Sequence, residues 1–331
     1  MPDRRQLLLT LLASPLVAGC VATRNSILPL PRGPDALTPR GEVRIVGYND
    51  MDEMLPQIAA AFARDHPEIR FHFELEGTRT APPALVAGRS AFAPMGADME
   101  EADIERIRAR YGRPPVRIEI AHASLKFNAL SSPTAIMVHR DNPLRSIDMA
   151  AVRDSFAPLA DARALTRWGQ LGLAGVWRDR PIHIFGLSAQ TAIGALMLRR
   201  LGARAFAPGF GAYPQSREVA AAVAGDPLAL GFANLSHVAG AVRALAVAGT
   251  DGVPVAGDEA GIRSGRYPFD RHLLIYARRE ADGRVEALAA AFLAFALSDA
   301  GQRIIAGGTR GYLPLNRRER ARQRAILGAI G

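Results

Sequence analysis

The sequence has only one cysteine among its 331 residues, Cys20. A lone thiol cannot form an internal disulfide, and without a second cysteine a structural zinc site is not expected. The histidines show no metal-ligand spacing either; they are His66, His72, His122, His139, His183, His237 and His272. We therefore expect neither a disulfide framework nor a bound metal.

Lysine is as rare as cysteine, because Lys126 is the only one and arginine supplies the other basic residues of a chain with net charge +9. The arginines are scattered among carboxylates, with no basic stripe interleaved with aromatic residues and no nucleic-acid motif. Their densest cluster, at 316–324, is typical of a solvated helix face. Nucleic acid is therefore not an expected partner, and the excess charge favours small anions or anionic lipid.

Long hydrophobic runs are also missing, and the N-terminal run "LLLTLLASPLV" is far below the ~20 residues that span a bilayer. Arg4 and Arg5 precede this run and small residues follow it, so residues 1–19 have the parts of a secretory signal. The string "LVAGC" resembles the lipobox of bacterial lipoproteins, in which the cysteine is acylated on sulfur and becomes the first residue. We expect Cys20 to be lipidated and to anchor a periplasmic protein to a bacterial membrane.

Two points about export stay open. "DRRQLLL" faintly resembles a twin-arginine signal, so the Sec and twin-arginine routes are both possible, and Val21 after the cysteine favours the outer membrane over the inner one. The residues after Cys20 contain four prolines and show no helical or strand period. Residues 20–41 are therefore predicted to be the lipidated cysteine and a flexible tether.

Beyond residue 41, short apolar strands alternate with amphipathic helices. "VRIVG" at 43–47 is strand-like and the apolar spacing after residue 54 is helical, and the same alternation continues to "GYLPL" at 311–315. Such alternation predicts an α/β fold with mostly parallel sheets.

Three loops of this α/β pattern combine glycine with hydroxyl or amide side chains just before a helix. They are "GYND" (47–50), "GTRTA" (77–81) and "GLSAQTA" (186–192). Ligand sites of α/β proteins lie beyond the carboxyl ends of strands, where unpaired N–H groups at helix N-termini suit an anion. Each loop alone is explained as an ordinary helix cap, but together they point to an anion site.

Six segments in order resemble the phosphate-binding lipoproteins and periplasmic proteins of ABC importers, the PstS-like family. They are "GYNDMDEML", "GTRTAPPALVAGRSAFAPMG", "VHRDNPL", "RWGQLGLAGVWRDRPIHIFG", "GRYPFDRHLLIYAR" and "GYLPL". Their order and spacing hold over roughly residues 42–315.

The resemblance implies a two-lobed periplasmic-binding fold of type II. One lobe would comprise residues 42–137 and 257–331 and the other residues 138–256, with two crossovers as a hinge. It also implies that the anion lies between the lobes, that an ABC permease in the inner membrane is the partner, and that the chain acts as a monomer without a cofactor. The expected ligand contacts are Asn49, Asp50, Thr78, Arg79, Thr80, Ser188, Gln190 and Thr191.

The chain also departs from the family pattern. Thr78 and Thr191 keep hydroxyls that the family uses, but several polar positions are lost; the replacements are Tyr48-Asn49-Asp50, Gly96-Ala97, Leu187 and Ala189-Gln190. A buried dianion that lacks donors costs several kcal/mol. Arg79 could restore a charge-assisted bond, and Asp50 is the candidate acceptor for a proton of phosphate.

These departures leave two functions open. The chain binds phosphate or a related oxyanion for an importer, or it is a non-transporting lipoprotein with a decayed pocket that acts as a sensor or partner-binding module. An enzyme is not expected, because "GLSAQ" lacks the G-x-S-x-G elbow and no Walker or Rossmann glycine pattern is present.

Overall fold

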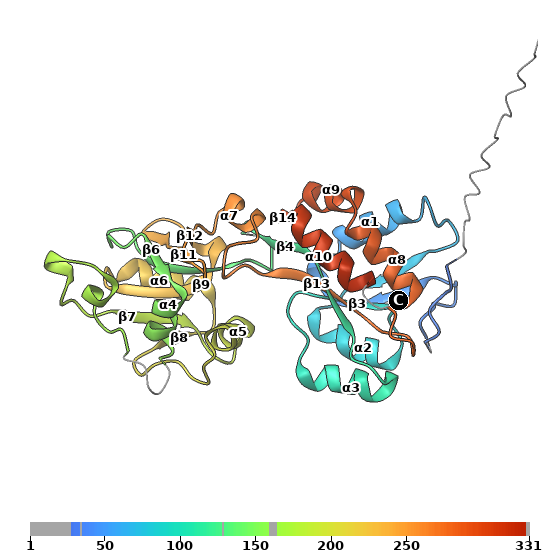
Figure 1. Ribbon diagram of the computed structural model, residues 1–331, viewed down its shortest axis with the longest axis horizontal. Coiled ribbons are helices and arrows are strands. Elements are labelled where there is room, and N and C mark those ends of the chain that lie inside the picture. The colour runs from blue at the N-terminus through green and yellow to red at the C-terminus, as the bar shows by residue number, and fades with distance from the viewer. Residues whose placement is uncertain (1–27, 34, 128, 159–163, 329–331) are drawn as a thin grey trace, which may run out of the picture.

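The computed structural model describes residues 28–328 except 34, 128 and 159–163. The predicted signal peptide and Cys20 therefore lie outside the described residues. Two lobes lie side by side, and the chain passes between them near β4 and β13 (Figure 1). The α/β, two-lobed architecture that the sequence predicted is confirmed.

Lobe 1 holds both ends of the described chain. Its main sheet has the order β14-β4-β13-β3 (Tyr312–Leu313, Val116–Ser124, His272–Ala277, Phe92–Met95), and β1 and β2 (Val43–Val46, Phe71–Glu74) form a parallel pair. Its helices are α1, α2, α3, α8, α9 and α10 (Met54–Phe62, Ala81–Ala87, Glu101–Tyr111, Ala287–Ala296, Asp299–Gly307, Arg317–Gly328).

Alternation along β13 gives lobe 1 two hydrophobic layers. Leu273 and Ile275 pack into the core formed with α1 and α8, whereas Leu274 and Tyr276 pack against α2 and α3. Because successive side chains of a strand point to opposite faces, one strand supplies both layers. The sheet is thus covered by helices on both sides, as Figure 1 shows.

Lobe 2 contains a five-stranded sheet with the order β10-β5-β9-β7-β8 (Val242–Ala244, Thr134–His139, Ala229–Asn234, His183–Leu187, Gly211–Tyr213). A smaller sheet has the order β12-β11-β6 (Pro254–Val255, Ala246–Ala248, Ser146–Asp148). The helices are α4, α5, α6 and α7 (Met149–Phe156, Ala192–Leu201, Ser216–Gly225, Glu259–Arg263). One hydrophobic core, centred on Trp168 and Phe232, unites these elements.

The chain crosses between the lobes at slightly different points from those predicted. All of β5 pairs within the lobe 2 sheet, so the first crossover precedes Thr134 and not residue 138. Ile262 and Phe269, expected in lobe 1, are buried in the core of lobe 2. A hydrogen bond from the Tyr267 hydroxyl to the Thr134 carbonyl (2.9 Å) joins the segment before β13 to the first residue of β5.

The sheets are mixed, and the prediction of mostly parallel sheets is wrong. Every pairing in the four-stranded sheet of lobe 1 is antiparallel, and β5 runs antiparallel to both of its neighbours. The parallel pairs are β1–β2, β7–β8, β7–β9 and β6–β11. The strands that carry the chain between lobes, β4, β5 and β13, lie in the antiparallel part.

The segment expected to be a flexible tether also folds in part. Ala36 is fully buried, and Leu37 forms a β-bridge with Val43. The Arg44 amide donates to the Ala36 carbonyl (2.9 Å). The folded body therefore begins before residue 42, because two apolar side chains of the proline-rich segment find partners on lobe 1.

Among the described residues, no single helix is long and apolar enough to cross a membrane. Only α8 and α9 taken together reach that length and composition, and they are bent by 64° relative to one another.

Candidate functional site

Three of the expected contacts share one turn at the start of α5 in lobe 2. The Thr191 hydroxyl accepts a hydrogen bond from the Gly194 amide (3.0 Å) and donates to the Ser188 carbonyl (2.8 Å). The Ser188 hydroxyl donates to the Gln190 side-chain oxygen (2.6 Å). A Cβ at Gly194 would lie 2.0 Å from the Ser188 carbonyl oxygen, so only glycine permits this close turn. Thr191 is thus an N-cap that holds the turn at the positive end of the helix.

Two more expected contacts lie in a turn of lobe 1. The Thr78 hydroxyl accepts from the Gly96 amide (3.1 Å), and the Thr80 hydroxyl donates to the Gly77 carbonyl (2.8 Å). Arg79, between the two threonines, is exposed. The Thr78 bond ties this turn to the end of β3, where Gly96 and Ala97 begin the next loop.

Tyr48 explains why Gly96 stands where the PstS-like pattern has serine. A Cβ on Gly96 would lie 2.5 Å from Cζ of the Tyr48 ring. The ring is buried, its hydroxyl lies 3.1 Å from the Ser131 hydroxyl, and burial raises the pKa of Tyr48. Tyr48 and Gly96 are therefore matched, because the Tyr48 ring leaves no room for a side chain at position 96.

A pocket lies between the two lobes, and we call it the interlobe pocket. Its lining residues come from β3, β4 and β13 with their adjoining loops in lobe 1 and from α5 in lobe 2; they are Gly96, Ala97, Asp98, Arg117, Ala192, Leu196, Arg199, Arg200, Arg271, His272 and Leu274. Four arginines face one aspartate, so the lining is positive. Its volume of about 60 Å³ suits a small inorganic ion.

Two of these guanidinium groups are held by carbonyl oxygens. Arg200 donates to the Pro268 carbonyl (3.0 Å) and to that of Asp270, and Arg271 donates to the Gly96 carbonyl (2.9 Å). Within the described part of the chain neither forms a salt bridge with a carboxylate. Burial lowers the pKa of both, although Asp270 and Asp98 nearby oppose this, and arginine stays charged in proteins. Both therefore keep a positive charge that no direct ion pair neutralises among the described residues.

Arg117 differs from these two because carboxylates already surround it. Its Nε lies 2.8 Å from Asp98, and its Nη1 lies 2.8 Å from Glu119. Its charge is therefore compensated before any ligand arrives.

The geometry around Asp50 does not fit the proton-accepting role that we expected for it. The side chain is buried, Arg310 and the Tyr312 hydroxyl donate to its oxygens, and the Leu130 amide adds a third bond (2.8 Å). Burial, with Asp50 beside it, raises the pKa of Tyr312. Asp50 thus serves as an internal counter-ion of lobe 1, and the neighbouring Asn49 is exposed.

Some of the expected contacts therefore lie beside the interlobe pocket, and others do not. Thr78 adjoins the interlobe pocket through Gly96, and Thr191 adjoins it through Ala192, whereas Asp50 is engaged within lobe 1. The sequence interpretation missed Arg200 and Arg271. Arg271 could have been found, since it is the first arginine of the "YPFDRHLLIYAR" segment, which carries the family resemblance.

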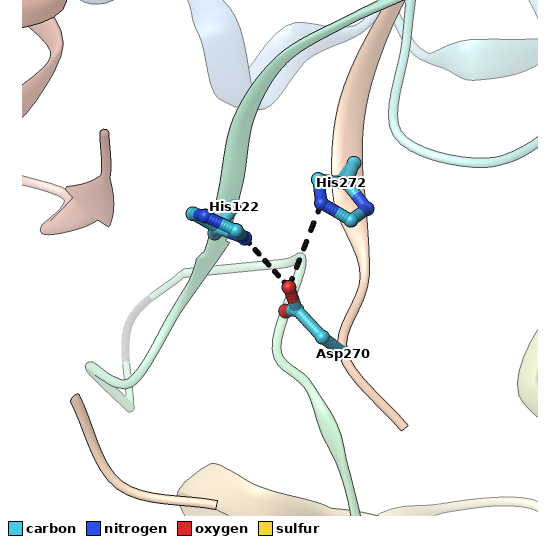
Figure 2. Close-up of side chains that lie close together, drawn as sticks. All are labelled: His122, Asp270 and His272. Carbon is cyan, nitrogen blue, oxygen red and sulfur yellow. Dashed lines mark hydrogen bonds and ion pairs between the residues drawn. The ribbon is translucent and has the colours of Figure 1, made fainter. Parts of the chain in front are cut away.

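A second group of titratable side chains lies beside the pocket, where β4 and β13 run together. We call His122, Asp270, His272 and Glu319 the crossover cluster (three of them in Figure 2). Asp270 and Glu319 accept from the two ring nitrogens of His122. Burial alone would lower the pKa of His122, but these bonds outweigh it and raise the pKa to about 9.

Comparison with known proteins agrees with this architecture. The PBP superfamily domain (PBP_like_2) matches residues 34–300. The phosphate-binding protein PstS of Pseudomonas aeruginosa is 27% identical over 280 residues, which are 83% of each chain.

Two solved structures share the fold. An ABC-type phosphate transport receptor from Vibrio cholerae has a TM-score of 0.52 at 17% identity, covering 82% of this chain and 99% of that one. PstS from Borrelia burgdorferi has a TM-score of 0.55 at 15% identity, covering 83% and 98%. These similarities confirm the PstS-like resemblance that the motifs predicted, and the chain belongs to the PBP superfamily.

Proposed function

We propose that this protein is an extracytoplasmic solute-binding protein of an ABC-type importer, and that it binds phosphate or a related oxyanion between its lobes. Family membership and the phosphate-binding relatives support this function. The observation that carries it is the interlobe pocket, in which Arg200 and Arg271 hold positive charge that no carboxylate salt bridge among the described residues compensates.

An anion in the pocket would supply the missing negative charge. Guanidinium groups bind oxyanions through paired N–H donors, and such charge-assisted bonds are among the strongest in proteins. The N-terminus of α5, capped by Thr191, adds a favourable dipole from lobe 2. The remaining contacts proposed from the sequence are neutral donors or a surface charge that approach as the lobes close; they are Asn49, Thr78, Arg79, Thr80, Ser188, Gln190 and Thr191.

The proposal includes the membrane attachment inferred from the sequence. Cys20 carries the lipid, the chain acts as a monomer on the periplasmic side, and an inner-membrane permease receives the anion. The chain serves as a binding protein and not as an enzyme. Mass spectrometry of the protein from bacterial membranes would show a diacylglyceryl group on Cys20 at the mature N-terminus, whereas an unmodified Cys20 would contradict the anchor.

Titration calorimetry with phosphate, sulfate and an organic phosphate tests the binding function. We expect saturable 1:1 binding of one of these anions, and Arg271→Met should weaken it about tenfold or more, because a charge-assisted hydrogen bond contributes ~1.5–3 kcal/mol. Arg64→Met, which removes an exposed arginine at the end of α1, is the matched control and should leave affinity unchanged.

The second candidate, a scaffold with a decayed pocket, is favoured by one observation. Tyr48 leaves no room for a side chain at Gly96, where the family pattern has serine, so a donor has been lost from lobe 1. Flat titrations with all three anions, from protein that is folded by circular dichroism, would establish this candidate and contradict the carrier.

A further inference from the structure

The crossover cluster brings two histidines side by side on neighbouring strands. His122 of β4 and His272 of β13 are register partners in an antiparallel ladder, and their ring centroids lie 4.9 Å apart. Asp270 precedes β13, and its Oδ2 lies 2.6 Å from His122 Nδ1 and 3.6 Å from His272 Nε2. Figure 2 shows both rings directed at this one carboxylate.

His272 carries an unexplained polar atom. Its Nε2 is buried and has no hydrogen-bond partner among the described residues. Nε2 lies 3.6 Å from the nearest oxygen of Asp270, too far for a hydrogen bond. Buried polar atoms are almost always satisfied in native proteins, and an unmatched one calls for a ligand or another explanation.

The surroundings hold the other two side chains in place. His122 Nε2 lies 3.0 Å from a Glu319 oxygen, which also accepts from the Asn316 amide (2.9 Å). Asp270 Oδ1 accepts from the Arg271 amide (2.7 Å), and Oδ2 is the oxygen that faces both histidine rings. A carboxylate behind a histidine is the arrangement that orients metal-binding imidazoles in proteins.

We propose that His122 Nδ1, Asp270 Oδ2 and His272 Nε2 form a site for a divalent transition-metal cation, with Zn²⁺ as the best match. These three atoms lie within 4.8 Å of one another. Small side-chain shifts would place all three at the ~2.0–2.2 Å that Zn²⁺ requires, and imidazole with carboxylate is a donor set that zinc accepts. His122 Nδ1 gives up the proton that it shares with Asp270 when the metal binds.

Three protein ligands leave a coordination position for water or another small ligand. His272 also lines the interlobe pocket, so this position lies close to the solute site. A metal here would tie β4 to the start of β13, the two segments through which the chain passes between lobes. The site does not depend on anion binding, and it is one that the sequence did not predict, because His122 and Asp270 are 148 positions apart.

Calorimetry with ZnCl₂ alone tests the proposal, on untagged Cys20→Ser protein in phosphate-free buffer. Under these conditions neither a purification tag, nor the lone thiol, nor phosphate in the buffer can bind the added zinc. We expect one saturable site per chain and at least a tenfold loss of affinity in His272→Gln. Glu319→Gln should weaken binding about 10- to 100-fold, the range found for residues that orient metal ligands.

His183→Gln is the matched control. His183 Nδ1 lies 2.6 Å from Asp226 Oδ2, the same separation as in the His122–Asp270 pair, and no second histidine joins them among the described residues. This variant should keep the zinc affinity of the parent. Co²⁺ should also give visible absorption bands of a four-coordinate site in the parent and not in His272→Gln.

The proposal would be overturned if the folded parent shows no saturable zinc binding, or if His272→Gln binds as tightly as His183→Gln. In either case the crossover cluster would be an ion-pair network only. His272→Gln is preferred over a change at His122, because the His272 ring forms no hydrogen bond with the residues that the structure describes. Thermal unfolding would confirm that the variant is folded.

Discussion

Asp50 and the interlobe pocket show two ways in which this protein handles buried charge. At Asp50 a carboxylate receives bonds from an arginine, a tyrosine and a backbone amide, so its charge is fully compensated. In the pocket, the hydrogen bonds that Arg200 and Arg271 form with described residues all go to carbonyl oxygens. Compensated charge stabilises the fold, whereas uncompensated charge held in place is available to a ligand. We expect this difference to separate the residues that stabilise the fold from those that bind the anion.

Removing Asp50 should have the largest effect in the molecule. Asp50→Ala leaves the Tyr312 hydroxyl and the Leu130 amide without an acceptor and weakens the fixation of Arg310. We expect the free energy of unfolding to fall by about 3–5 kcal/mol, as for a broken buried ion pair. Urea denaturation followed by circular dichroism measures this.

The control for Asp50 is Asp52→Ala, since Asp52 also pairs with Arg310 (2.8 Å) but has a half-exposed side chain. An exposed pair contributes about 1 kcal/mol or less. If Asp50→Ala left stability intact and abolished anion binding, Asp50 would be a ligand after all and the comparison would fail.

Arginine substitutions in the pocket should lower the affinity for the anion more than they lower stability. Arg200→Met is expected to weaken anion binding by about 1.5–3 kcal/mol and to lower stability less than Asp50→Ala does. The variant gives up two hydrogen bonds to carbonyl oxygens and no salt bridge with the described residues. Arg117→Met is the internal comparison: its charge is compensated by Asp98 and Glu119, so calorimetry should find a smaller loss of affinity. Equal losses of affinity in the two variants would show that pairing with carboxylates does not decide which arginine binds the anion.

The match between Tyr48 and Gly96 should appear in a double-mutant cycle. Gly96→Ser places a side chain against the Tyr48 ring, and overpacking of this kind costs about 1–3 kcal/mol. Adding Tyr48→Ser removes the ring, so the double variant should be more stable than the sum of the two single effects predicts. Strict additivity in urea denaturation would rule out the coupling.

Arg79→Ala should have the smallest effect. The side chain is exposed, so its contribution to anion affinity is expected to stay below about 1 kcal/mol and to fade as salt is added. Calorimetry at two ionic strengths checks this. A salt-independent loss as large as that of Arg200→Met would instead place Arg79 inside the closed site.

Local patterns predicted most of the fold, and they failed where pairing is long-range. The helical spacing after residue 54 and the strand at 43–47 appear as α1 and β1. β4 was overlooked, although "VRIEIAHAS" alternates over its first residues. The direction of strand pairing was also predicted wrongly. The partners of β4 and β5 lie far away in the sequence, and local patterns do not indicate them.

The candidate site was also predicted only where its features are local in the sequence. Thr191 is a helix cap, a local feature that the sequence "GLSAQTA" shows directly. Asp50 was misjudged because its partner Arg310 lies 260 positions away, and nothing near Asp50 in the sequence indicates it. Arg271 was overlooked because its charge matters only once the absence of a carboxylate partner is known.

The sequence alone determined what depends on neighbours along the chain: the alternation of strands and helices, the caps of the helices, and the ordered motifs that indicate the family. Only the tertiary structure decided which buried charges are compensated, and which histidines of distant strands meet. The reason is physical, since the energy of a buried charge depends on the groups within a few ångströms of it in space.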